Sequence, residues 1–108
     1  MEGFPGNFQQ MFEQAKQMQE KIADLQSDVE KKEITASAGG GMVTATVNGG
    51  QVVTALTIDK AVVNPDDIEM LQDLVRAAVN EGVRKSKSLM KDELSKITGG
   101  IPIPGFGA

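Results

Sequence analysis

The stretch that decides the fold runs from Met42 to Asp59 and reads MVTATVNGGQVVTALTID. Two runs of alternating apolar and polar residues meet at Asn48-Gly49, and such alternation is typical of strands with one buried face. Asn-Gly favours the two-residue type I′ turn of a β-hairpin, because both central residues of that turn take a positive φ. This turn predicts three pairs of opposite residues, namely Val47 with Gly50, Ala45 with Val52 and Val43 with Thr54.

The predicted register gives the hairpin one face that requires burial. That face contains Val43, Ala45, Val47, Val52, Leu56 and Ile58. The other face contains Thr44, Thr46, Gln51 and Thr57, with Val53 and Ala55 as apolar exceptions. Residues 33–38 alternate in the same way and predict a third strand, joined to the hairpin by a turn at residues 39–41, which are all glycine. We therefore expect a sheet that positions helices and performs no chemistry itself.

The segment from about Asn7 to Lys32 predicts a long amino-terminal helix. Its apolar residues follow alternating steps of four and three, at Met11, Ala15, Met18, Ile22, Leu25 and Val29. This spacing forms a seam of nearly three heptads, which either lies on the helix's own domain or pairs with another chain. We favour partial docking, with the amino-terminal part projecting or crossing to another subunit.

A second long helix is predicted after Asn64, which is a suitable N-cap followed by Pro65 at the first helical position. Asp66, Asp67 and Glu69 suit the positive end of that helix. An apolar stripe follows for up to about 30 residues, and Gly82 within it indicates close contact or a bend. The helix should end at Gly99-Gly100, because Pro102 and Pro104 prevent its continuation.

Composition limits the possible functions. The 108 residues fit one domain, residues 1–108, with a flexible start at 1–6 and a Gly/Pro tail at 100–108. The chain has no Cys, so it can use neither a disulfide nor a thiolate. It also has no His, which is the commonest general base near neutral pH and the commonest ligand for transition metals. We expect no cofactor, no metal, no small-molecule substrate and no catalysis. An enzyme working through carboxylates such as Asp59 or Asp67 is the least favoured alternative.

The amino terminus lacks the pattern of a secretory leader, and no run approaches the roughly 18 apolar residues of a membrane span. We therefore expect a soluble protein that is not exported and makes no membrane contact. Its core is small for a monomer, which favours self-association.

Charge is unevenly distributed along the chain. The formal net charge is −4, from 11 basic and 15 acidic residues. Residues 76–96 are the exception, with six basic and three acidic residues. Arg84, Lys87 and Lys91 recur there at helical spacing, with Lys85 beside them, and form either a phosphate-binding patch or an ordinary solvated helix face. Lys16, Lys21, Lys31 and Lys32 are second-rank candidates because acidic residues flank each of them.

Three motifs in order carry a resemblance to a known family. They are GGGMVTATVNGG at 39–50, NPDDIEMLQDLVRAAVNEG at 64–82 and TGGIPIPG at 98–105. In this order, after a Met- and Gln-rich helix, they resemble the bacterial YbaB/EbfC family of nucleoid-associated proteins over nearly the whole chain. The resemblance implies a small α+β subunit, a homodimer with projecting helices, and cytoplasmic, nucleoid-associated binding of duplex DNA with little sequence preference.

The resemblance favours the phosphate-binding interpretation of the basic residues. Candidate DNA-binding residues are then Arg84, Lys85, Lys87, Lys91, Lys16, Lys21, Lys31 and Lys32, and candidate core or dimer residues are Met11, Met18, Ile22, Leu25, Val29, Val43, Val47 and Leu56. The alternative is a non-catalytic protein-interaction module that uses the amino-terminal heptad helix.

Overall fold

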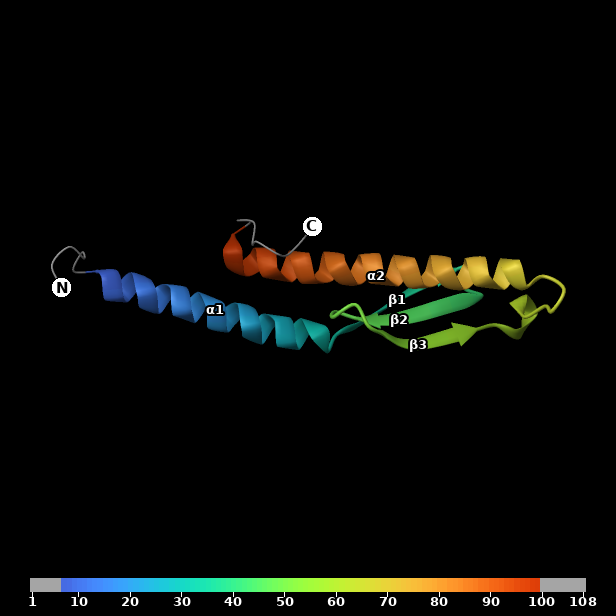
Figure 1. Cartoon of the computed structure of the whole chain (residues 1–108), viewed down its shortest axis with the longest axis horizontal. Coiled ribbons are helices and arrows are strands. Elements are labelled where there is room, and N and C mark those ends of the chain that lie inside the picture. Colours follow the sequence, from blue (N-terminus) through green and yellow to red (C-terminus); the bar gives the residue numbers. More distant parts are fainter. Residues whose placement is uncertain (1–6, 100–108) are drawn as a thin grey trace.

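Two long helices and a three-stranded antiparallel sheet form the protein (Figure 1). The computed structural model describes residues 7–99. The elements are α1 (Phe8–Glu30), β1 (Glu33–Ala38), β2 (Val43–Asn48), β3 (Val53–Ile58), the 3-10 turn η1 (Lys60–Val62) and α2 (Ile68–Thr98). The predicted α+β class and element order are confirmed. Two predicted segments, 1–6 and 100–108, lie outside the described residues.

The hairpin between β2 and β3 forms, but the predicted register is wrong. Val43 lies opposite Ile58 and Ala45 lies opposite Leu56, with an irregularity at Thr46/Val47. Neither Asn48 nor Gly49 has the positive φ that a type I′ turn requires. The strands are instead joined by residues 49–52, a longer connection.

Tertiary contacts explain why the longer connection replaces the tight turn. Gly49 N–H donates to the Lys32 carbonyl at 2.9 Å, and a Cβ on Gly49 would lie 2.0 Å from the Val29 carbonyl oxygen. The buried Ser86 hydroxyl of α2 donates to the Asn48 carbonyl at 2.6 Å and accepts from Gln51 N–H at 3.1 Å. The connection is therefore clamped between the end of α1 and the middle of α2, which outweighs the local preference of Asn-Gly.

The start of α2 also differs from the prediction. Asp67, and not Asn64, is the N-cap, and its carboxylate accepts from Met70 N–H at 3.2 Å. Asn64 instead closes a preceding turn, because its side chain accepts from Asp66 N–H and its carbonyl accepts from Asp67 N–H. The other end is confirmed, since Gly99 caps α2 in the left-handed conformation with φ 64°.

α2 lies across β1 and β2 and forms the core with them. Val43, Ala45 and Val47 of β2 are fully buried, and Ala78 of α2 is buried against the same cluster. Gly82 permits the close approach, because a Cβ there would lie 2.5 Å from the Val47 side chain. The prediction of close contact at Gly82 is confirmed.

α2 leaves β3 largely uncovered. The prediction that Leu56 and Val52 are buried is wrong, since they are 43% and 55% exposed. Leu56 nevertheless points to the α2 side of the sheet, because it lies opposite the buried Ala45. A shallow apolar groove runs beside β3, and its apolar lining consists of Ile58, Leu71, Val75 and Val79.

α1 meets the body only at its C-terminal part. Val29 is fully buried and Ile22 and Leu25 are half-buried, while Met11 is 57% exposed and Met18 is 40% exposed. α1 contacts α2, and the N-terminal half of α1 extends past the end of α2 (Figure 1). This geometry matches the expected partial docking with a projecting amino-terminal part.

Candidate nucleic-acid interface

The C-terminal half of α2 presents a row of cations to solvent. At 100° per residue, Arg84, Lys87 and Lys91 fall within about 60° of one another, on the side of the helix opposite the buried Gly82 and Ser86. All three are exposed. They span two helical turns, about 10 Å along the axis. We call these three residues the α2 cation face.

No neighbouring carboxylate within the described chain neutralises the two lysines of the α2 cation face. Neither Lys87 nor Lys91 forms an ion pair with any residue between 7 and 99. The row therefore gives a local positive potential on a molecule whose net charge is −4.

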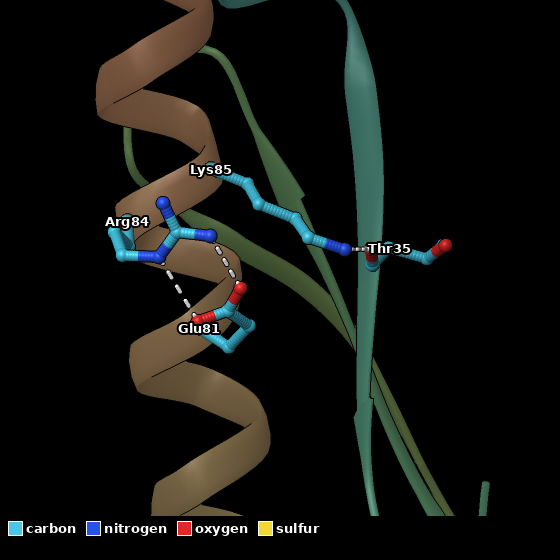
Figure 2. Close-up of polar contacts among 4 residues, drawn as sticks. All are labelled: Thr35, Glu81, Arg84 and Lys85. Carbon is cyan, nitrogen blue, oxygen red and sulfur yellow. Dashed lines mark hydrogen bonds and ion pairs between the residues drawn. The ribbon is translucent and has the colours of Figure 1, made fainter.

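Arg84 differs from the two lysines because a carboxylate engages it. Its Nε and Nη2 donate to the two carboxylate oxygens of Glu81 at 3.0 and 2.5 Å (Figure 2). The hydrogen bonds from Arg84 hold the pKa of Glu81 below its ordinary value, and the same contact raises the pKa of Arg84. Glu81 is consequently ionised at neutral pH and offsets part of the charge of Arg84.

Lys85 lies apart from the α2 cation face. Its ammonium reaches across to β1 and donates to the Thr35 carbonyl at 3.3 Å, on the opposite side from the Arg84 guanidinium (Figure 2). This contact satisfies a backbone acceptor at an edge of the sheet, because β1 is an outer strand. The sequence placed Lys85 beside the other three cations, whereas the fold directs it toward the sheet.

The remaining basic residues do not form one surface with the α2 cation face. Lys32 lies 4.0 Å from Glu93, which also pairs with Lys96 at 3.1 Å, and Arg76 pairs with Asp73 at 2.7 Å. Lys16, Lys21 and Lys31 are exposed on or just after α1. Residues 8–30 carry five acidic groups and two basic ones, so α1 is acidic as a whole.

Sequence reasoning missed two residues that shape this region. Glu81 stands three positions before Arg84, a spacing at which opposite charges pair on a helix. Ser86 follows Ala78 and Gly82 at steps of four and therefore shares their buried stripe. Both signals were present in the sequence.

Other kinds of site find no support within residues 7–99. No group of three or more acidic side chains there is arranged to hold a metal ion. Neither α1 nor α2 is sufficiently apolar over a sufficient length to cross a bilayer.

An exposed row of cations on a small α+β subunit is typical of a protein that contacts a polyanion. Comparison with known proteins identifies the group to which this subunit belongs. Residues 4–101 match the YbaB/EbfC DNA-binding family, and the chain belongs to that family.

Relatives and one solved structure agree with this assignment. A nucleoid-associated protein of Syntrophobacter fumaroxidans is 52% identical over 94 residues, covering 87% of this chain and 86% of the relative. A nucleoid-associated protein of Clostridium acetobutylicum is 45% identical over 108 residues and 96% of each chain. An uncharacterized protein of Helicobacter pylori superposes with a TM-score of 0.75 at 25% identity, over 85% of this chain and 97% of that one.

Proposed function

We propose that the protein is a nucleoid-associated protein that binds duplex DNA through phosphate contacts, with little sequence preference and without catalysis. The observation that carries this proposal is the α2 cation face, which presents three exposed cations on one side of a rigid helix. Such a row follows the phosphates of one strand without reading base edges. In the cell we expect the protein on cytoplasmic nucleoid DNA, where it influences nucleoid organisation or gene expression.

We further propose that the chain acts as a homodimer in which a second copy covers the β3 side of the sheet. Two features support this arrangement: the apolar groove between β3 and α2, and the exposed apolar residues Val53 (40%) and Leu56 (43%) of β3 itself. The outer edge of β3 also has no neighbouring strand within the described chain. Dimerisation presents the α2 cation face twice, which raises the number of phosphates that one particle neutralises.

The dimer is tested by light scattering at micromolar concentration, where we expect twice the mass of the chain. Leu56→Lys should reduce the mass to that of a monomer, because it places a charge in the covered surface. Thr57→Lys is a matched control, since Thr57 is exposed on the opposite face of the same strand. A wild-type protein that scatters as a monomer would refute the dimer.

DNA binding is tested by gel shift with unrelated duplexes at several salt concentrations. A dimer that neutralises about four phosphates, mainly through Lys87 and Lys91 of each copy because Glu81 engages Arg84, should lose roughly 10²-fold in affinity between 50 and 200 mM salt. The triple variant Arg84→Gln, Lys87→Gln, Lys91→Gln should lose most of this salt dependence and weaken binding to all duplexes about equally. Retention that salt does not affect, or a loss confined to one sequence, would contradict phosphate contacts.

The control for this variant removes three positive charges elsewhere. Lys60, Arg76 and Lys96 are exposed, lie outside the α2 cation face and are not candidate DNA-binding residues, so their replacement by Gln changes net charge equally. We expect the control variant to retain most of the affinity. Equal losses in the two variants would assign binding to overall charge and overturn the α2 cation face as the site.

One further observation favours a second candidate function, a protein-interaction module. Met11 and Phe12 near the start of α1 are 57% and 64% exposed, and exposed large apolar residues on a projecting helix are typical of a partner-binding surface. This function predicts a salt-independent protein complex and no retention of DNA. The same gel-shift series therefore distinguishes it from DNA binding.

A further inference from the structure

The three cations of the α2 cation face are not equivalent, and Glu81 causes the difference. Two donors of the Arg84 guanidinium point at the Glu81 carboxylate (Figure 2). Lys87 and Lys91 have no ionic partner within residues 7–99. Arginine binds carboxylate and phosphate with the same planar pair of N–H donors. The Glu81 carboxylate thus occupies one of the two edges of the Arg84 guanidinium through which a phosphate could bind with a pair of hydrogen bonds.

The pair is open to solvent, so that an external anion has access to it. The Arg84 and Glu81 side chains are 64% and 41% exposed. Exposed ion pairs of this kind are weak, because water and salt screen them. A phosphate can therefore displace Glu81, but the displaced carboxylate stays one helical turn away and repels the phosphate.

We propose that Glu81 competes internally with DNA phosphate for Arg84 and so holds the DNA affinity of the α2 cation face below the value that its three cations would give. This inference rests on the proposed function and names the residue that tunes it. Glu81 acts through Arg84 and touches no DNA, so it is a tuning residue and not a contact residue.

The test compares two substitutions that change the net charge equally. Glu81→Gln removes the competing carboxylate and keeps the size of the side chain. Asp92→Asn is the matched control, because Asp92 lies eleven residues further along α2, about three turns, and thus on nearly the same side. Asp92 is exposed and forms no ion pair within the described chain.

Gel-shift titrations of the full chain should separate the two variants. We expect Glu81→Gln to bind duplex DNA about threefold more tightly per subunit, or roughly tenfold more tightly for a dimer that binds through both copies. We also expect its salt dependence to steepen by about one phosphate per subunit, a slope change of roughly 0.9 each. Asp92→Asn should change affinity less than about twofold.

A double variant shows whether the effect passes through Arg84. In a protein that already carries Arg84→Gln, Glu81→Gln should raise the DNA affinity no more than Asp92→Asn does. Equal gains for Glu81→Gln and Asp92→Asn, or a full gain that persists without Arg84, would overturn the inference and leave DNA binding intact. Absence of DNA binding by the wild type and by every variant at low salt would instead overturn the proposed function. Circular dichroism of each variant establishes that it is folded.

Discussion

Strands β2 and β3 have nearly the same composition but very different surroundings. β2 reads VTATVN and β3 reads VTALTI, and both alternate apolar and polar residues except at Ala55-Leu56 in β3. In β2 every second residue is fully buried, whereas Val53 and Leu56 of β3 are 40% and 43% exposed. The alternation thus marks a strand with one apolar face, but it does not indicate whether that face is covered within the same chain.

Small residues determine which strand is covered. α2 approaches the sheet where Ala36 of β1 lies opposite Ala45 of β2, and Gly82 faces Ala36 and the neighbouring Val47. The missing side chain at Gly82 and the short ones at Ala36 and Ala45 let the helix axis come close to the first two strands. β3 presents Leu56 at the corresponding position and remains beside the helix, at the groove that we assign to a second copy.

The largest expected effect concerns Gly49, where the end of α1 holds the connection between β2 and β3. Gly49→Ala should destabilise the protein by about 3 kcal/mol or prevent folding, because the new Cβ would lie 2.0 Å from the Val29 carbonyl oxygen. A backbone atom cannot move aside as a side chain can. Urea unfolding measures the loss. Gly40→Ala is a control without a clash, since nothing lies within 4 Å of a Cβ there. It should cost only about 1 kcal/mol, because Gly40 has a φ of 68° that an alanine adopts with strain. A Gly49→Ala protein as stable as the wild type would contradict the clamp.

The next effect compares the two strands directly. Val47 and Val53 lie opposite each other, but Val47 is fully buried and Val53 is 40% exposed. Val47→Ala should therefore lower the free energy of unfolding by about 2 kcal/mol, and Val53→Ala by less than about 1 kcal/mol, where light scattering reports a monomer. If a second copy covers β3, the loss for Val53→Ala should grow with protein concentration. Equal losses of unfolding free energy for Val47→Ala and Val53→Ala in the monomer would contradict the difference in burial between β2 and β3.

A smaller effect is expected where α2 holds the connection between the strands. Ser86→Ala should lower the free energy of unfolding by about 1 kcal/mol, because the partly buried hydrogen bonds of the hydroxyl to the Asn48 carbonyl and from Gln51 N–H are lost. Ser88→Ala on the exposed side of α2 should have almost no effect. Thermal unfolding of the two variants side by side measures the difference. An equal change in stability for Ser86→Ala and Ser88→Ala would show that the Ser86 hydroxyl does not stabilise the connection between β2 and β3.

The smallest effect is expected at Gln51, which has a φ of 66°. Gln51→Gly should be neutral or raise the free energy of unfolding by about 0.5 kcal/mol, because glycine adopts this conformation without strain but loses more entropy on folding. Gln51→Ala retains the Cβ and should bring no gain. Thermal unfolding of the three proteins checks this order, and a clear loss on Gln51→Gly would indicate that the Gln51 side chain itself stabilises the connection.

The candidate site was only partly predictable from sequence. Spacing placed Arg84, Lys87 and Lys91 on one side of a helix, and the structure finds them there. Spacing could not assign Lys85, because its partner is a carbonyl of β1, fifty residues away in sequence. It also allowed Glu81 to pair with Arg84, but only the folded structure shows that both carboxylate oxygens are engaged.

The sequence by itself determined the two helices, the three strands, the bounds of β1 and the stop at Gly99, because periodicity and capping act over a few neighbouring residues. The helix start at Asp67 is also set by local hydrogen bonds of Asn64 and Asp67, although the sequence offered both residues as caps. Tertiary structure alone decided the hairpin register and the exposure of β3. The register changed because Gly49 is fixed between Val29 and Lys32 and because Ser86 bonds to the connection. Contacts from distant helices are worth more than the preference of a two-residue turn, and a local pattern does not contain them.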